Sequence, residues 1–86
     1  MNKKFSDVAF EEYLYWQENK KTFFKKINAL IKSIERDGAL KGEGQPEKLK
    51  YLNDTYSRRI DKANRLVYQI VENTIVIKSC KGHYDD

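Results

Sequence analysis

Three side chains in this sequence could together break a phosphodiester bond in RNA, although they lie far apart in the chain. Such a reaction needs a base for the 2′-hydroxyl proton, a cation for the charge that builds on the phosphate, and an acid for the leaving 5′-oxygen. Glu47 directly follows the only proline and is the candidate base. Arg65 is the candidate cation because a guanidinium matches phosphate oxygens, and His83, the only histidine, is the candidate acid.

Each of these residues also has an ordinary structural interpretation, which the residues alone leave open. A histidine close to a chain end is usually surface decoration, and Glu47 taken by itself is typical of a loop carboxylate. The Arg58–Arg59 pair is typical of a solvated strand, and Tyr84 could fill the core. Arginine neighbours would lower the pKa of Glu47 and burial would raise it, so the balance stays open at this point.

Other chemistries lack the residues that they need. Zinc sites use several cysteine and histidine ligands, and this chain has one of each. Two-metal nucleases need converging carboxylates, which the strand-forming segments nearly lack. The GEGQPE stretch has neither the lysine nor the Ser/Thr ending of a phosphate-binding loop. The sequence therefore predicts metal-independent chemistry with no cofactor, and Cys80 is interpreted as a small buried residue.

Composition predicts one soluble domain over residues 1–86. The chain is 40% hydrophobic and 13% aromatic, which is typical of a globular protein. Its 17 basic and 13 acidic residues give a net charge of +4, and Asp85 and Asp86 partly mask a more basic body, so a polyanionic partner is expected. A single cysteine and the lack of an 18-residue apolar run predict a cytoplasmic protein that does not enter membranes.

Two helices are predicted to support the site from the first half of the chain. Ser6 is a good N-cap for the first helix, and the second is expected to begin near Asn19 and to end at Gly38. Hydrophobic residues recur at helical spacing in both. The stripe of the second helix consists of Phe23, Ile27, Leu30 and Ile34.

After an irregular stretch at 39–53, the hydrophobic period changes to two. Strands are predicted at 55–60, 65–71 and 74–80, with a short leading strand at 3–5. Helices followed by consecutive strands predict an α+β fold, in which two N-terminal helices pack on one face of a small antiparallel sheet.

A tight turn at Glu72–Asn73 sets the register of the last two strands, because it gives one consistently apolar face. Arg59 is expected opposite Arg65, since a shift of one residue would place Arg59 in the core. The open face then gathers Arg59, Arg65 and Lys78, and the last strand carries His83 towards Arg65. The predicted pairs are Val71 with Thr74, Ile70 with Ile75, Tyr68 with Ile77, Gln69 with Val76, Val67 with Lys78, and Arg65 with Cys80.

Nearly the whole chain resembles the YoeB/Txe toxins of the RelE superfamily. The segments that carry the resemblance are EEYLYWQENKK, FFKKINALIKSIERD, GEGQPEKLK, SRRI, NRLVYQIV and the HY near the end. The resemblance implies a RelE-like fold and a ribosome-dependent mRNA endonuclease of a type II toxin–antitoxin pair. Such a toxin acts on mRNA in the A site of the 70S ribosome, commonly as a homodimer, and leaves a 2′,3′-cyclic phosphate. Its implied partner is a YefM-like antitoxin.

The resemblance also implies roles for particular residues. Glu47 would be the general base, Arg65 would stabilise the scissile phosphate, His83 would be the general acid, and Tyr84 would position the substrate. Lys50 and Arg59 would contact phosphates, and Lys78 on the same open face joins them as a candidate substrate-binding residue. The chain departs from the family pattern at Lys48, where proline is common, at Tyr56, where tryptophan is common, and in the two aspartates after Tyr84.

Two other functions belong to different classes. A non-catalytic toxin of the same superfold, as in the gyrase-directed ParE branch, would block its target by binding, and that branch generally lacks the Glu/Arg/His set. A plain basic RNA-binding domain would bind free RNA in a salt-dependent way without ribosomes.

Overall fold

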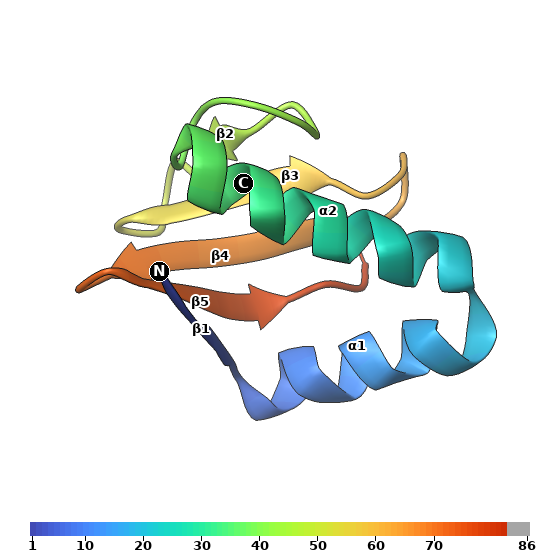
Figure 1. Cartoon of the computed structure of the whole chain (residues 1–86). Helices are drawn as coiled ribbons and strands as arrows, with labels where there is room; N and C mark the ends of the chain where they lie inside the picture. The colour runs from blue at the N-terminus through green and yellow to red at the C-terminus, as the bar shows by residue number, and fades with distance from the viewer. Residues whose placement is uncertain (83–86) are drawn as a thin grey trace.

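Two helices lie across one face of a five-stranded sheet in the computed structural model, which describes residues 1–82 (Figure 1). No helix within those residues is long and apolar enough to cross a membrane. The elements in chain order are β1 (Asn2–Phe5), α1 (Asp7–Asn19), α2 (Lys21–Asp37), β2 (Glu47–Lys48), β3 (Thr55–Arg59), β4 (Arg65–Val71) and β5 (Thr74–Ser79).

The helices begin and end close to where the sequence places them. The Ser6 side chain accepts a hydrogen bond of 3.0 Å from the Ala9 N–H and so caps α1. Lys20 adopts an extended conformation and separates the helices, so α2 begins at Lys21 rather than at Asn19. Gly38 ends α2 with a φ of 96°, and its N–H bonds to the Ile34 carbonyl. The predicted helical layer is therefore confirmed.

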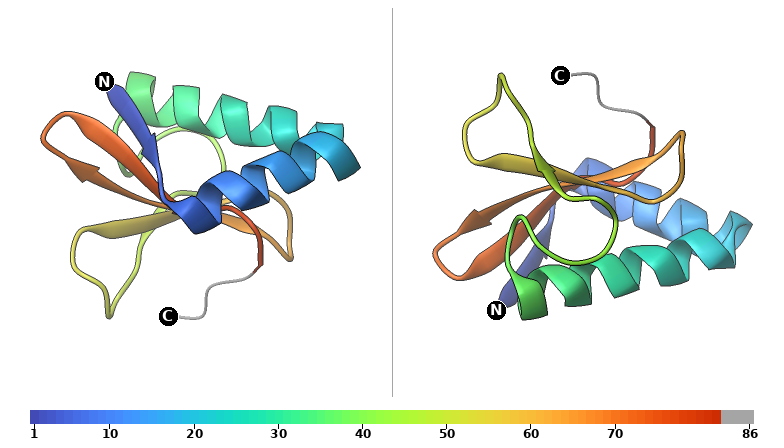
Figure 2. Two further views of the ribbon diagram at one scale, coloured as in Figure 1. Left: turned by 90° about the horizontal axis from the view of Figure 1, so that it is seen from below. Right: turned by 90° about the horizontal axis from the view of Figure 1, so that it is seen from above.

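The core lies between this helical layer and one face of the sheet, and both views in Figure 2 place the helices on the same side of the strands. Trp16 of α1 packs its indole edge-on against Phe23 of α2 at a centroid distance of 4.9 Å. The fully buried side chains that join the layers are Ala9, Ile27, Leu30 and Ile34 from the helices and Leu66, Tyr68, Ile75 and Ile77 from the sheet.

The sheet has the order β1-β5-β4-β3-β2 and is mixed. The predicted antiparallel pairing is confirmed for β3, β4 and β5, and β2, which the sequence did not predict, pairs with β3 in the same antiparallel way. The leading strand joins the other edge, where β1 pairs with β5 in parallel, from Asn2 opposite Thr74 to Phe5 opposite Ile77. The first and last strands of the fold are therefore neighbours.

The predicted register is correct in most of the sheet and wrong near the end of β5. Arg59 lies opposite Arg65, and the β4–β5 pairs from Val71–Thr74 to Tyr68–Ile77 are as expected. The β4–β5 turn has φ values of 49° at Glu72 and 61° at Asn73. A bulge between Val67 and Tyr68 then places Val67 opposite Ser79 instead of Lys78, and turns Cys80 into the core instead of opposite Arg65.

The short strand β2 falls within the stretch that the sequence predicted to be irregular. Glu47 pairs with Ser57 and Lys48 with Tyr56, so the segment after Pro46 joins the sheet edge. The approach to β2 is fixed by Gly44, whose carbonyl accepts a 2.6 Å hydrogen bond from the Arg59 N–H. A Cβ at Gly44 would lie 2.6 Å from Leu30, and its φ is 86°, so only glycine allows this close approach.

Candidate active site

Glu47 and Arg65 meet on the face of the sheet that points away from the helices. Their side chains form an ion pair, with 3.3 Å between Arg65 Nη1 and Glu47 Oε1. Ser57 of β3 stands between their strands, and its hydroxyl accepts a 3.4 Å hydrogen bond from the same Nη1 atom. The three residues share one face because Glu47 pairs with Ser57, while Arg65 lies opposite Arg59, two residues further along β3.

The Arg65 side chain is largely buried, whereas the Glu47 side chain is open to solvent and to a substrate. The Arg65 side chain is 13% exposed, whereas that of Glu47 is 58% exposed. The guanidinium is therefore held in one place by its surroundings, and the carboxylate stays accessible to solvent. A phosphate that approached this face would find a fixed cation next to a carboxylate that can accept a proton.

The remaining basic candidates are spread along the open face and its edge. Arg59 is exposed on β3, directly opposite Arg65. Lys78 is exposed on β5 at the bulge, and Lys50 is exposed shortly after β2. The structure thus brings Glu47, Arg65 and Arg59 together, while Lys78 lines a separate hollow on the same face.

His83 and Tyr84 lie outside the described residues, but the chain that leads to them is anchored. The Gly82 carbonyl accepts a 3.0 Å hydrogen bond from the Arg65 N–H. The Gly82 N–H donates to Asn64 Oδ1 at 2.7 Å. The last described residue is therefore tied to the backbone of Arg65.

Asn64 is a positioning residue that the sequence analysis missed. Besides holding Gly82, it closes the β3–β4 hairpin, because Asp61 Oδ1 accepts from both the Asn64 N–H at 2.7 Å and its Nδ2 at 3.0 Å. The sequence signal was available, since aspartate and asparagine around a short loop are typical of such turns.

Helix α1 fixes the same end of the chain from the opposite side. Trp16 Nε1 donates to the Cys80 carbonyl at 2.8 Å, and Glu12 Oε1 accepts from the Cys80 N–H at 2.8 Å. The thiol itself is fully buried and donates to the Ala9 carbonyl at 3.6 Å. Burial, with a smaller contribution from the nearby Glu12 charge, raises the pKa of Cys80 to about 12, so it has a structural role here.

Arg58 was interpreted as a solvated residue, and the structure shows that this is wrong. Its side chain is fully buried and stacks near the Tyr68 ring. Its guanidinium holds the segment between α2 and β2 by donating to backbone carbonyls, the Ser33 hydroxyl and the Tyr68 hydroxyl. The carbonyls are those of Gly38, Lys41 and Glu43, at 2.6 to 2.9 Å.

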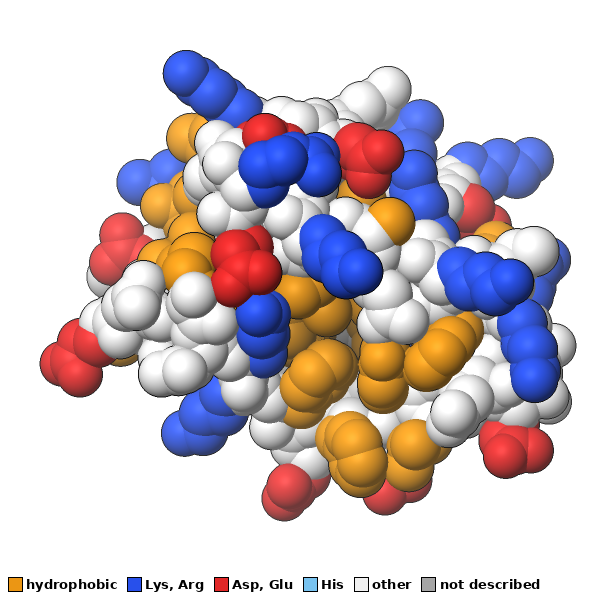
Figure 3. All heavy atoms as spheres, viewed as in Figure 1, with side chains coloured by type: hydrophobic (Ala, Val, Ile, Leu, Met, Phe, Trp, Pro, Cys, Tyr) orange, Lys and Arg blue, Asp and Glu red, His pale blue; other side chains and the backbone are white. Residues whose placement is uncertain are grey.

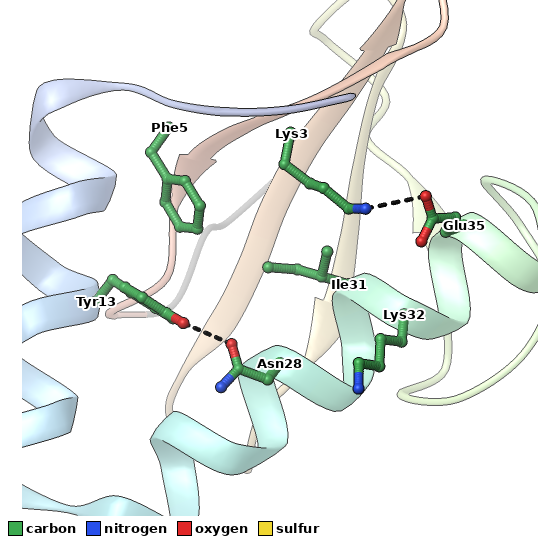
Figure 4. A pocket seen from close by; sticks show the side chains of 7 residues that line it. All are labelled: Lys3, Phe5, Tyr13, Asn28, Ile31, Lys32 and Glu35. Atoms are coloured by element: carbon green, nitrogen blue, oxygen red, sulfur yellow. Dashed lines mark hydrogen bonds and ion pairs between the residues drawn. The ribbon is translucent and has the colours of Figure 1, made fainter. Parts of the chain in front are cut away.

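The surface formed by residues 1–82 includes two hollows that bear on the site. The larger, of about 420 Å³, lies between β1 and the helices, on the opposite side of the sheet from Glu47 and Arg65. Figure 4 shows its walls, with Lys3 bonded to Glu35 and Tyr13 bonded to Asn28, and Figure 3 shows hydrophobic side chains gathered over this region. The smaller, of about 360 Å³, lies on the open face beside the ion pair, and is lined by Leu52, Thr55, Val67, Gln69, Lys78 and Ser79.

Comparisons with known proteins agree over nearly the full chain. Residues 5–84 match the family described as YoeB-like toxin of bacterial type II toxin-antitoxin system. Toxin YoeB of Escherichia coli K12 is 44% identical over 80 residues, which cover 92% of this chain and 94% of that protein.

Solved structures show the same fold. The YoeB dimer from Staphylococcus aureus is 55% identical with a TM-score of 0.93, and the match covers 98% of each chain. A YoeB–YefM complex from the same organism is 56% identical with a TM-score of 0.91 and equal coverage.

Proposed function

Because this chain belongs to the YoeB-like toxins of bacterial type II toxin–antitoxin systems, we propose that it is a ribosome-dependent endoribonuclease. Its substrate is mRNA in the ribosomal A site. The observation that supports this most directly is the 3.3 Å pair of Glu47 and Arg65 on the open face of the sheet. A base and a phosphate-binding cation from separate strands are thereby adjacent, as cleavage of RNA at a 2′-hydroxyl requires.

In the proposed reaction, Glu47 takes the proton of the 2′-hydroxyl, and the 2′-oxygen attacks the neighbouring phosphorus. Arg65 stabilises the charge that grows on the phosphate oxygens. The bond from phosphorus to the 5′-oxygen breaks as His83 donates its proton to that oxygen. The products are a 2′,3′-cyclic phosphate and a 5′-hydroxyl, and no metal or other cofactor takes part.

The free protein holds its base and its cation against each other, and the substrate has to separate them. A phosphate oxygen competes with Glu47 for the Arg65 Nη1 atom, and the carboxylate, which is 58% exposed, is free to turn towards the hydroxyl. Arg65 does not need to move, because Ser57 and its own burial keep it in place. Tyr84, Lys50, Arg59 and Lys78 orient the RNA around this point.

The partners proposed for this chain are those with which its relatives were solved. A YoeB relative was solved as a dimer and another in complex with YefM. We therefore infer that this chain forms a homodimer and is neutralised by a YefM-like antitoxin. Its site of action is the cytoplasm, where ribosomes carry mRNA.

The test is cleavage of a defined mRNA on purified 70S ribosomes, with new 5′ ends mapped by primer extension. The wild type is expected to cut within the A-site codon, and Glu47→Gln should slow cleavage by about 100-fold or more because the amide cannot accept the proton. His83→Gln should slow it by a similar factor. The matched control is Glu43→Gln, which removes an exposed carboxylate four residues before Glu47 and should leave the rate unchanged.

Wild-type protein that leaves the mRNA intact would overturn the proposal. If it arrested growth without cuts and changed DNA supercoiling, it would instead be a non-catalytic toxin of the ParE type. Salt-sensitive binding to free RNA without cleavage would identify a plain RNA-binding domain.

A further inference from the structure

The smaller hollow, on the open face of the sheet, lies next to the candidate active site along both β3 and β4. Thr55 precedes Ser57 by two residues on β3, and Val67 follows Arg65 by two residues on β4. Residues two apart in a strand share a face and are separated by about 7 Å. The hollow is therefore about one nucleotide away from the ion pair.

The bulge in β5 shapes this hollow. In a regular strand, Lys78 and Ser79 would point to opposite faces of the sheet. The extra residue at the bulge instead lets both side chains line the same hollow, with Ser79 directly opposite Val67. Such irregularities re-aim side chains and are frequent beside functional sites.

The polar groups of the hollow include one acceptor and one cation that have no partner among residues 1–82. Gln69 Nε2 donates to Thr55 Oγ1 at 3.1 Å and to the Asn53 carbonyl at 3.4 Å, which fixes the amide. No residue in the range 1–82 donates a hydrogen bond to Gln69 Oε1 or forms an ion pair with Lys78. Val67 and Leu52 supply apolar walls.

We propose that this hollow binds a nucleobase of the mRNA next to the cleaved bond, with Gln69 and Lys78 as the residues that determine base specificity. A volume of about 360 Å³ lies within the range of small-ligand pockets. The apolar walls suit the faces of a flat ring, and the polar pair suits its edge. This inference rests on the proposed function, since it assigns a subsite of the same reaction.

The chemistry of the two polar groups favours guanine. The Lys78 ammonium is a donor that matches the adjacent O6 and N7 acceptors of guanine, and the amino group of guanine can donate to Gln69 Oε1. On the edge that corresponds to O6 and N7 of guanine, cytosine presents an amino donor, and adenine offers N7 but places an amino group where guanine has O6. A segment of another protein chain is the competing occupant, and the test below separates it from a base.

The first test measures cleavage rates on ribosomes programmed with mRNAs in which each A-site position carries each of the four bases. The wild type is expected to prefer guanine at one position by about 10-fold or more. Gln69→Leu should reduce that preference to less than about threefold by slowing cleavage of the preferred codons. Lys78→Met should reduce it as well. The matched control is Gln17→Leu, an exposed glutamine of α1, which should keep the ranking.

The second test measures binding without chemistry. Trinucleotides with a 2′-O-methyl group at the cleaved position, containing guanine or uracil next to it, are titrated into the full-length protein while the side-chain amide of Gln69 is followed by NMR. The guanine trinucleotide should shift this signal and bind at least about 10-fold more tightly than the uracil one. Gln69→Leu, for which the backbone amides of β3 and β4 are followed instead, should remove the difference.

The two tests fail in different ways. If the wild type cleaves mRNA but Gln69→Leu and Lys78→Met keep its base ranking, the subsite is refuted and the nuclease stands. If the wild type binds the guanine trinucleotide through Gln69 but does not cleave, the nuclease is refuted and the base pocket stands. If the Gln69 signal responds only to protein concentration or to an added antitoxin, the hollow is a protein interface and the inference is overturned.

Discussion

At the scale of single residues, Cys80 joins the last strand to the first helix. Its carbonyl, its N–H and its thiol all bond to α1, through Trp16, Glu12 and Ala9. Because the thiol is fully buried, ionising it would place a charge in the core beside the Glu12 carboxylate. The raised pKa of Cys80 therefore makes the thiol less reactive and also makes the stability of the fold depend on pH.

This raised pKa predicts how stability changes at high pH. The folded state keeps the thiol proton up to a pKa of about 12, whereas a thiol with the ordinary value of 9.0 loses it earlier in the unfolded state. The contribution is complete below pH 9 and is lost as the pH rises towards 12. We expect urea unfolding to show the wild type losing about 2 kcal/mol between pH 9 and 11 relative to Cys80→Ala. Parallel pH curves for the two proteins would contradict this.

Arg58 shows how far the sequence could predict individual residues. Alternation in a strand means that a register with Arg59 on the open face necessarily places Arg58 in the core. The burial of Arg58 could therefore have been inferred from the pairing that was predicted correctly. Its partners could not, because the carbonyls of Gly38, Lys41 and Glu43 become acceptors only once the connecting segment takes its shape.

At the scale of elements, the segment from Gly38 to Pro46 is a structured connection that delivers Glu47 to the sheet. It contains no regular structure of its own, so its carbonyls depend on partners elsewhere. Arg58 supplies three of those partners from inside the molecule. Gly42 lets the segment pass Ser33, where a Cβ would lie only 2.2 Å from the hydroxyl.

Substituting Arg58 tests this dependence. Arg58→Met keeps the apolar stem but leaves three partly buried carbonyls and two hydroxyl groups without this donor, and should lower the free energy of unfolding by about 3 kcal/mol. Arg58→Lys should not restore it, because one ammonium cannot reach groups that the planar guanidinium spans. Urea unfolding measures the stability, and hydrogen exchange should show faster exchange in residues 38–46.

The neighbouring arginine is the matched control for stability. Arg59→Met removes an exposed side chain from the same strand and should change the free energy of unfolding by less than about 0.5 kcal/mol. Equal effects of the two substitutions would mean that the buried contacts of Arg58 contribute nothing net.

The sequence predicted the long elements and the leading strand, but it missed β2 and the bulge in β5. Hydrophobic periodicity identifies α2, β4 and β5 because each buries one face over many residues. Strand β2 has only two residues, and the bulge at Lys78 is a single extra residue. Neither leaves a periodic signal, since both arise from how neighbouring strands fit together. Both lie at the candidate site.

At the scale of the whole molecule, the order of the strands ties the two ends of the chain together. Within residues 1–82, β1 lies at one edge of the sheet and has β5 as its single neighbouring strand. The N–H groups of Asn2 and Ser6 donate to Asn73 and Ile77 of the β4–β5 hairpin. Alternate residues of a parallel strand face the same neighbour, so the N–H of Lys4 faces β5 and that of Lys3 faces outwards.

Proline substitutions separate these two positions. Lys4→Pro removes a donor from the pairing with β5 and should lower the free energy of unfolding by about 2 to 3 kcal/mol. Lys3→Pro removes an outward N–H and a surface ion pair with Glu35, and should cost less than about 1 kcal/mol. Thermal and urea unfolding of both variants measure the difference, and a reversed order of stabilities would refute the assigned edge.

The sequence predicted the leading strand but not its neighbour. A strand at the N-terminus can join either edge of a sheet, and the pattern of Lys3, Lys4 and Phe5 carries no information about the choice. The packing of α1 places β1 beside β5. Helix α1 starts directly after β1, and its Trp16 side chain bonds to Cys80 just after β5. Such long-range constraints are absent from local sequence patterns.

The pairing of the first strand with the last has a consequence for the order in which the sheet is completed during synthesis. Residues 2–5 have no strand to pair with until β5, some seventy residues later, has left the exit tunnel. Arg65 likewise gains its neighbour Gly82 only after β5 has been made. Strand β1 and the backbone contact of Arg65 are therefore among the last parts of this fold to form.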